Sequence, residues 1–580
     1  MQKYISITIL IIVIIIGTGL RVWRLIDFPS IMGDEATNGE EIIRVLNDPY
    51  ITVFFPNNTG REALFFYLSI PVFMILGPTL FALRSISILA GILLIPLSYR
   101  WAKILLPKSK RREWIALITA ILIATSPWAL YNSRVGLRGG LLPVFMLGAY
   151  IFFWKGYLNR QIGWFVVSGI FLGLCSYIYT SSRLLPLTFV GFGISLLIYG
   201  KSQEKYIKLT WKGIVIVGCV AFVVFLPLGG YFFCHPDSFL SRTMEVSLLG
   251  EYYNGDHLTN QHILVYLLSS WKQFITFFIQ LTTPWMQNQT WPLPIRIFPL
   301  IFWLGLVRAV YLTRNHTSYS FLLISFFVGM LPIFYTFPTT LRNVLALPPT
   351  YLLQAIGAYF IIETVLFFKR QTSNRQTLFS LVALLSLLFI STLSASNLFR
   401  FENWIVGLSN VPQERWVNMA HLPTVADHTI NTTTQRIKHL VLHQRQSVLI
   451  PYSFYDETLA KFLFQSNFDL SNPIENQYST VQPSESISII WSPLFNEKPK
   501  NFFLISPTTK EGFGQVTLIG EWASDSLPML IEILYNNQSK TNVIYNVNDQ
   551  SVGFFVEADY EKIVGFLQPT DIDLHIGTKK

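Results

Sequence analysis

Long apolar stretches recur through the chain and limit its fold more than any other feature. Half of the residues are hydrophobic (51%) and only 13% are charged, roughly half the charged share of a soluble domain. Because a helix needs about 20 mostly apolar residues to cross a bilayer, the pattern predicts a polytopic α-helical membrane protein with about eleven transmembrane helices. The predicted spans begin near Tyr4, Thr79, Trp114, Gly139, Trp164, Leu184, Gly213, Ile297, Tyr319, Asn343 and Leu378.

The basic residues of the short loops predict the orientation, since loops rich in Lys and Arg stay in the cytoplasm. With eleven spans, all these loops lie on one side, which predicts a cytoplasmic N-terminus and a multi-pass protein of the bacterial plasma (inner) membrane. The loops are centred on residues 103–112, 155–160, 201–212, 308–314 and 369–375.

The extracytoplasmic parts are then residues 21–78, residues 232–296, everything after residue 396, and the short turns around Arg134, Arg183 and Arg342. Within the first, residues 36–47 have the spacing of an amphipathic helix. Residues 63–77 are apolar but short and contain Pro71, which favours an interfacial helix over a span.

A change of composition near Asn397 predicts two domains, a transmembrane domain 1–396 and an extracytoplasmic domain 397–580. The second carries 13 Lys and Arg against 19 Asp and Glu, although the whole chain has a net charge of +10. The basicity therefore belongs to the membrane part and not to a nucleic-acid-binding face. Alternating strand and helix patterns predict a mixed α/β fold, with strands near 447–451, 487–490, 502–506, 516–519, 529–534 and 542–545 and helices at 435–444 and 456–464.

Arginine supplies the positive charge of the predicted outer face. The planar guanidinium binds phosphate through two parallel hydrogen bonds, which an ammonium cannot do. A single arginine at a helix end can instead extend to the lipid headgroups, but the set together predicts a lipid-phosphate site. Arg61 belongs to this set, and the predicted phosphate-binding residues are Arg84, Arg134, Arg138, Arg183, Arg242 and Arg342.

Two adjacent carboxylates, Asp34 and Glu35, follow the first span. Asp34 has the alternative role of a helix N-cap. A carboxylate near a phosphate site can also deprotonate an acceptor hydroxyl while the phosphate leaves, so Asp34 is predicted as the general base and Glu35 as its catalytic neighbour. Glu62 and His235 are predicted at the acceptor or a metal, with pairing to Arg61 and a structural role as their respective alternatives.

Several short motifs share an order and spacing with a known class. They are residues 33–35, 61–67, 77–84, 126–134 and 177–186, followed by residues 235–236, Arg242 and Arg342. From Leu20 to about Phe368 the chain resembles the GT-C class of polyprenyl-phosphate-dependent glycosyltransferases. Within that class it resembles the superfamily of protein O-mannosyltransferases and lipid A aminoarabinose transferases, which is glycosyltransferase family 39-like.

The resemblance implies an inverting glycosyltransferase that moves a sugar from a polyprenyl phosphate to an acceptor hydroxyl on the outer face. It implies Asp34 as the base, Glu35 beside it at the acceptor, and Glu62 at a family position linked to a metal. Glu245 stands where the family has a histidine partner. Whether the protein binds a divalent metal ion therefore stays open, with Glu62 as the one candidate ligand. The implied partners are the lipid-linked sugar, a protein, lipid or glycan acceptor, and membrane lipids.

Other classes remain possible from the sequence. A transporter or lipid flippase would place ionisable residues near mid-bilayer, where Glu363 is the one acidic candidate. A membrane sensor would recognise its ligand through the outer domain. An oligosaccharide ligase or a wall-glycan transferase would share the same pattern, and neither the sugar nor the acceptor is predicted.

Overall fold

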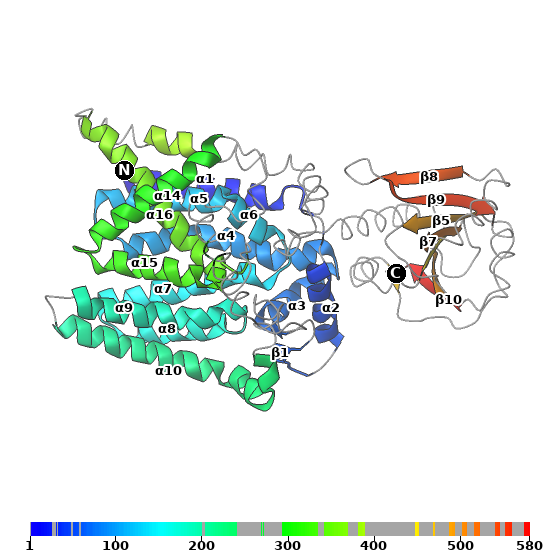
Figure 1. Ribbon diagram of the computed structural model, residues 1–580, viewed down its shortest axis with the longest axis horizontal. Coiled ribbons are helices and arrows are strands. Elements are labelled where there is room, and N and C mark those ends of the chain that lie inside the picture. Colours follow the sequence, from blue (N-terminus) through cyan, green and yellow to red (C-terminus); the bar gives the residue numbers. More distant parts are fainter. Residues whose placement is uncertain are drawn as a thin grey trace.

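Helices form most of the described part of the chain (Figure 1). The computed structural model describes residues 2–25, 29, 31, 33–47, 50–56, 60–199, 204–239, 268, 271, 293–334, 341–368 and 381–388, together with strands between residues 447 and 579. The α-helices are α1 (Gln2–Val22), α2 (Gly33–Asn47), α3 (Leu64–Leu76), α4 (Leu80–Leu105), α5 (Lys110–Thr125), α6 (Pro127–Arg134), α7 (Leu142–Asn159), α8 (Ile162–Cys175), α9 (Leu185–Tyr199), α10 (Glu204–Cys234), α14 (Leu293–Leu312), α15 (Thr317–Met330) and α16 (Leu347–Phe368).

Among these residues, six helices are long and apolar enough to cross a membrane. A seventh span results if α5 and α6, bent by 52° at their junction, are counted together. The prediction of a helical protein with several apolar spans is therefore confirmed, whereas the count of eleven is not. Predicted spans at Trp164 and Tyr319 correspond to α8 and α15, which have only 14 residues each, and the last predicted span is described only at residues 381–388.

Local sequence explains where the helices start and why α5 breaks. The side chains of Thr79, Ser109 and Ser126 accept hydrogen bonds from the first turns of α4, α5 and α6, as N-cap residues do. Pro127 then occupies the start of α6, where its missing N–H costs nothing. A proline there also ends the preceding helix, because it disfavours helical geometry for the residue before it.

Short 3₁₀ turns replace α-helix at one end of the bundle. They are η1 (Arg138–Leu141), η2 (Thr180–Leu184), η4 (Leu331–Phe334) and η5 (Val344–Ala346). The same end carries α2, α3 and a two-stranded ribbon, β1 (Phe54–Phe55) paired antiparallel with β2 (Arg61–Glu62) (Figure 1). Irregular backbone is tolerated in a membrane protein where protein buries it or it lines a cavity, so this end is where a site is expected.

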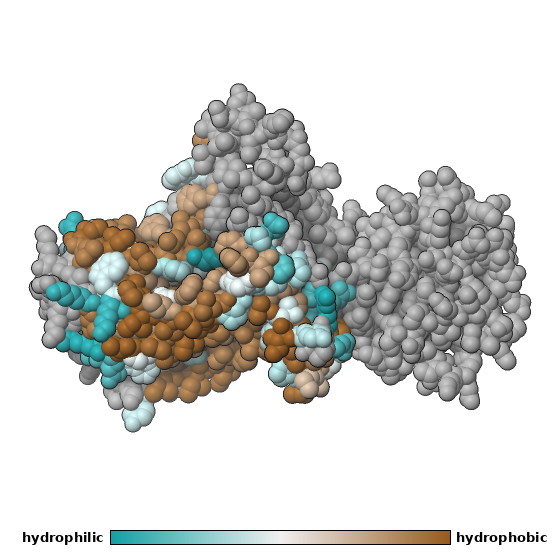
Figure 2. All heavy atoms as spheres, turned by 90° about the horizontal axis from the view of Figure 1, so that it is seen from below, coloured by the Kyte–Doolittle hydropathy of each residue, from teal (hydrophilic) through white to brown (hydrophobic). Residues whose placement is uncertain are grey.

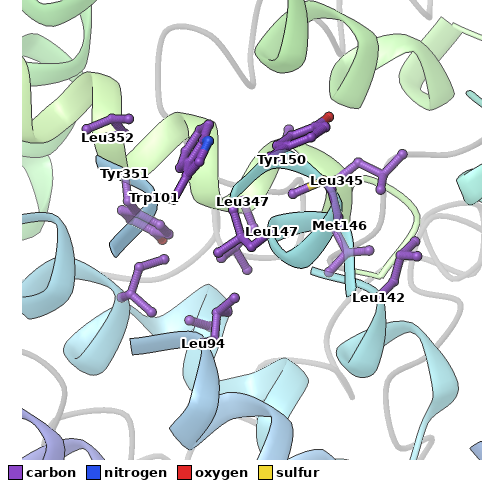
Figure 3. Close-up of a cluster of buried hydrophobic side chains, with 14 of the residues drawn as sticks. Leu94, Trp101, Leu142, Met146, Leu147, Tyr150, Leu345, Leu347, Tyr351 and Leu352 are labelled. Atoms are coloured by element: carbon purple, nitrogen blue, oxygen red, sulfur yellow. The ribbon is translucent and has the colours of Figure 1, made fainter. Parts of the chain in front are cut away.

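The core lies between α4, α7 and α16 (Figure 3). The rings of Trp101 in α4 and Tyr150 in α7 lie 6.0 Å apart, and Leu94, Met146 and Tyr351 belong to the same cluster. All five side chains are buried. This packing holds the irregular segments that precede α7 and α16 in fixed positions at the end of the bundle.

The surface of the bundle separates into an apolar band and polar ends. Hydrophobic side chains cover its middle, and hydrophilic ones gather at both ends (Figure 2). Arg111 at the start of α5 pairs with Glu363 near the end of α16 at 2.6 Å. The acidic residue that a transporter would require at mid-bilayer is therefore in an ion pair beside a basic loop.

The strands after residue 446 form an eight-stranded mixed sheet in the order β4-β10-β6-β3-β7-β5-β9-β8. Predicted strands at 447–451, 487–490, 502–506, 516–519 and 542–545 coincide with β3, β5, β6, β7 and β8, whereas β4, β9 and β10 were not predicted. The boundary near Asn397, the predicted strand 529–534 and the helices 435–444 and 456–464 lie outside the described residues. The strands are β3 (Ser447–Pro451), β4 (Phe468–Asp469), β5 (Ser486–Ser492), β6 (Asn501–Ser506), β7 (Val516–Glu521), β8 (Lys540–Tyr545), β9 (Ser551–Asp559) and β10 (Asp573–Lys579).

Candidate active site

A partly open pocket of about 330 Å³ lies at the end of the bundle that carries α2 and the β1–β2 ribbon. Its wall combines one carboxylate, two guanidinium groups, an amide and a phenol with apolar side chains. It is lined by Asp34, Asn38, Arg61, Leu137, Arg138, Gly139, Tyr179 and Leu341. Residues from five separate parts of the chain thus meet around one small polar space.

Asp34 lies at the N-terminus of α2 with its side chain 32% exposed. The helix begins at Gly33, so Asp34 lies in its first turn and is not the cap of a helix starting at residue 36. A carboxylate there is stabilised by the helix dipole. Arg61 Nη2 lies 3.7 Å from Asp34 Oδ1, which places positive charge beside an accessible carboxylate.

Asn38 holds this arrangement together from one helical turn further along α2. Its amide Nδ2 donates to the carbonyl of Gly136 at 2.9 Å, and its Oδ1 accepts from Arg61 Nη1 at 2.9 Å. Arg61 itself follows Gly60, whose φ of +109° is a conformation that favours glycine. The turn and the amide together fix the guanidinium beside Asp34.

The side chain of Glu62 lies on the opposite side of the β2 strand from that of Arg61. Its Oε2 accepts from Arg138 Nη1 at 2.6 Å, and its Oε1 accepts from Thr180 Oγ1 at 3.0 Å. The partner of Glu62 is therefore Arg138 and not the neighbouring Arg61. Because both side chains are almost buried, the pair presents the Arg138 guanidinium at a fixed place in the pocket wall.

Glu35 and Arg84 form a fully buried ion pair away from the pocket lining. Arg84 Nε and Nη2 donate to the two carboxylate oxygens at 2.9 and 2.7 Å, and Arg84 Nη1 donates to the carbonyl of Leu25. Glu35 also accepts from the backbone N–H of Gly136. These bonds join α2, α4 and the segment after α6, so both residues position the site from behind it.

Two further predicted arginines have backbone partners. Arg134 is buried and donates to the carbonyls of Leu20, Arg21 and Arg24 at 2.9 to 3.1 Å, which satisfies the C-terminal end of α1. Arg183 donates to the carbonyl of Phe239 at 2.7 Å and lies over its ring.

The remaining predicted residues fall near the pocket or outside the described chain. Arg342 is 8% exposed and directly follows the pocket residue Leu341. His235 is exposed just after α10, where it stacks on Tyr231 and its Nδ1 lies 3.1 Å from the Tyr231 carbonyl. Arg242 lies outside the described residues.

The described side chains of the pocket do not fit the coordination of a divalent cation. No group of three or more His, Cys, Asp or Glu side chains converges among those residues. Both oxygens of Glu62 are bonded to Arg138 and Thr180. Two guanidinium groups beside one carboxylate suit an anion better than a metal ion.

Sequence reasoning named Asp34 and the arginines but missed the residues that organise them. Asn38 follows Asp34 by four positions and so lies on the same side of α2, a signal that was readable. Tyr179 and Leu341 reach the pocket through the irregular segments before η2 and η5. Nothing in local periodicity predicts which residue of such a segment lines a pocket.

A helical bundle with a carboxylate and arginines in irregular backbone at one end is similar to the GT-C glycosyltransferases. Residues 63–231 match the family model of dolichyl-phosphate-mannose-protein mannosyltransferases. The predicted resemblance is thereby confirmed. No curated protein matches the chain at a significant level.

Solved structures of two proteins are similar to this chain. The oligosaccharyltransferase of Archaeoglobus fulgidus in complex with zinc and sulfate superposes with a TM-score of 0.50 at 14% identity, over 79% of this chain and 61% of that one. The same enzyme, AglB, with an inhibitory peptide and a dolichol-phosphate gives 0.49 at 14% identity, over 80% and 65%. The chain thus spans less than two thirds of the length of that enzyme.

ArnT from Cupriavidus metallidurans, bound to undecaprenyl phosphate, matches with a TM-score of 0.41 at 12% identity, over 97% of this chain and 98% of that one.

Proposed function

We propose that the protein is an inverting glycosyltransferase that moves a sugar from a polyprenyl phosphate to an acceptor hydroxyl on the outer face of the membrane. The observation that carries this proposal is the pocket that Asp34 lines together with Arg61 and Arg138, with Arg61 beside the Asp34 carboxylate. It supplies a base and positive charge in one space, which is what transfer from a lipid phosphate requires.

The chemistry needs few groups because phosphate already leaves readily. Asp34 accepts the proton of the acceptor hydroxyl as that oxygen attacks the anomeric carbon from the side opposite the phosphate. The bond between the anomeric carbon and the phosphate oxygen breaks, and the electron pair stays on the phosphate. Arg138 then meets the developing negative charge from a position fixed by Glu62, so little reorganisation is needed.

The predicted arginines divide into three groups under this proposal. Arg138 and Arg342, with Arg61, bind the donor phosphate, since they line the pocket or adjoin it. Arg84 and Arg134 position α2 and α1 through the bonds that they make. Arg183 and Arg242 remain candidates for later contacts with the lipid, and His235 for contacts near the acceptor, whereas Glu35 positions α2 through Arg84.

The outer orientation has support from the distribution of charge. The basic loops at residues 103–112 and 155–160 lie at the end of the bundle opposite the pocket (Figure 1). If those loops stay in the cytoplasm, the pocket opens on the other side, where a flipped lipid-linked sugar would reach it. The acceptor is a protein, lipid or glycan hydroxyl.

Asp34→Asn tests the role of the base. Removing the proton acceptor while keeping the side chain's size is expected to lower sugar transfer by about 10²–10⁴-fold. The assay is single-turnover transfer in proteoliposomes with a polyprenyl phosphate sugar as donor. Binding of the donor lipid should be nearly unchanged, since the arginines remain.

Glu40→Gln is the matched control, because it removes one acidic group from the same helix outside the pocket lining. Its transfer rate should equal that of the wild type. Wild-type transfer in the Asp34→Asn protein would refute the proposed base. Facilitated movement of the lipid-linked sugar across the bilayer without any transfer would indicate a flippase.

A further inference from the structure

A second pocket lies at the opposite end of the bundle, between α4, α5, α7 and the start of α15. Its volume is about 440 Å³, and it is partly open to the surroundings. The glycosyltransferase chemistry proposed above makes no use of it. Hydrophilic side chains gather on the surface at this end of the molecule (Figure 2).

The charge of its lining is entirely positive. Arg100, Lys103, Lys108 and Arg112 line the pocket, and no acidic residue does. Lys103 is paired with Glu113 at 2.9 Å. Within the part of the chain that the structure describes, Arg100, Lys108 and Arg112 have no carboxylate in ion-pair distance, so no described ion pair neutralises their charge.

Two buried donors in the same wall have no hydrogen-bond acceptor among the described residues. They are the indole Nε1–H of Trp154, which is 2% exposed, and the hydroxyl of Ser318, which is 6% exposed. A buried polar group that lacks a partner costs about 1–3 kcal/mol. The indole N–H can only donate, so an acceptor atom is what this wall lacks.

The N-terminus of α15 adds a third source of positive potential. His316, Thr317 and Ser318 all line the pocket, and the N-cap His316 makes no side-chain hydrogen bond to the first turn. The first N–H groups of a helix and its dipole favour an anion at this position. Cations, buried donors and a helix start therefore converge on one ligand type, an oxyanion.

We propose that this pocket binds the phosphate of an anionic phospholipid headgroup. Arg100 and Arg112 hold the phosphate oxygens, and Trp154 and Ser318 donate to them from the pocket floor. Ile104 and Leu158 supply an apolar rim, and Leu158 is 53% exposed on the bundle surface, where an acyl chain can lie. Basic pockets between membrane helices are suited to such headgroups.

The test measures binding of a soluble short-chain phosphatidylglycerol to the purified full-length protein by thermal shift and native mass spectrometry. Phosphatidylcholine of equal chain length and inorganic phosphate are the comparison ligands. Phosphatidylglycerol should bind at least tenfold more tightly than either. The double change Arg100→Gln and Arg112→Gln should weaken it at least tenfold, and Trp154→Phe, which removes only the donor, should weaken it severalfold.

Arg314→Gln is the matched control, since Arg314 is an exposed cation of the same end that does not line the pocket. It should leave phosphatidylglycerol binding unchanged. Equal weakening by Arg314→Gln and by the double change would show a general surface attraction and overturn the proposal. Inorganic phosphate that binds as tightly as phosphatidylglycerol would assign the pocket to a free anion and overturn the lipid assignment.

Discussion

The two neighbouring carboxylates that follow α1 have different environments. Asp34 is a third exposed and lines the pocket, whereas Glu35 is fully buried against Arg84. Successive residues of a helix point about 100° apart, so one side chain reaches the pocket and the next reaches α4. Adjacent acidic residues in a sequence therefore need not share a role.

Arg84→Ala tests whether this arginine stabilises the fold or binds the donor phosphate. It leaves Glu35 as a buried charge without its main partner, which is expected to destabilise the protein by about 3–5 kcal/mol. Arg111→Ala is the control, because Arg111 and its partner Glu363 are 57% and 30% exposed, and an exposed pair contributes at most about 1 kcal/mol. Both are measured by chemical unfolding in detergent. Unchanged stability with loss of donor binding would instead support the phosphate role predicted from the sequence.

At the scale of elements, the sequence predicted the apolar helices well and the irregular segments poorly. Apolar stretches of 20 residues are a strong signal for a span, and α1, α4, α7 and α10 lie where expected. The start of α2 at Gly33 and the 52° break before α6 depend on local capping and on tertiary contacts. Tyr179 and Leu341 of the pocket belong to irregular segments and were not identified, whereas the position of Asn38, one turn after Asp34, was readable from the sequence.

Gly136 shows how closely these segments pack. Its N–H donates to Glu35 and its carbonyl accepts from Asn38, and a Cβ there would lie 2.7 Å from Leu83 Cγ. Gly136→Ala is expected to lower stability by about 1–3 kcal/mol, the usual cost of overpacking, and to slow sugar transfer because α2 must shift. Gly19→Ala is the control, since a Cβ at Gly19 meets nothing within 4 Å. Equal stability and transfer in both variants would contradict this description of the site.

At the scale of the whole molecule, the bundle carries different chemistry at its two ends. One end has a pocket with Asp34 and two arginines, and the other has a pocket whose charged residues are all basic. All described residues that line the first pocket lie between positions 34 and 341. The described strands after residue 446 form a mixed sheet of their own and contribute no residue to that lining.

Removal of residues 397–580 tests whether the protein is an enzyme or a membrane sensor. If the site between residues 34 and 341 binds the donor, the shortened chain should retain donor binding within about threefold of the full-length value, less than the roughly 1.4 kcal/mol that a tenfold change represents. Full-length Arg138→Ala should lose at least tenfold, because a pocket guanidinium is missing. Binding is measured with a polyprenyl phosphate sugar in nanodiscs, after size-exclusion chromatography has shown that each protein is monodisperse. Loss of binding in the shortened chain, with normal binding in Arg138→Ala, would assign recognition to the C-terminal region and favour the sensor.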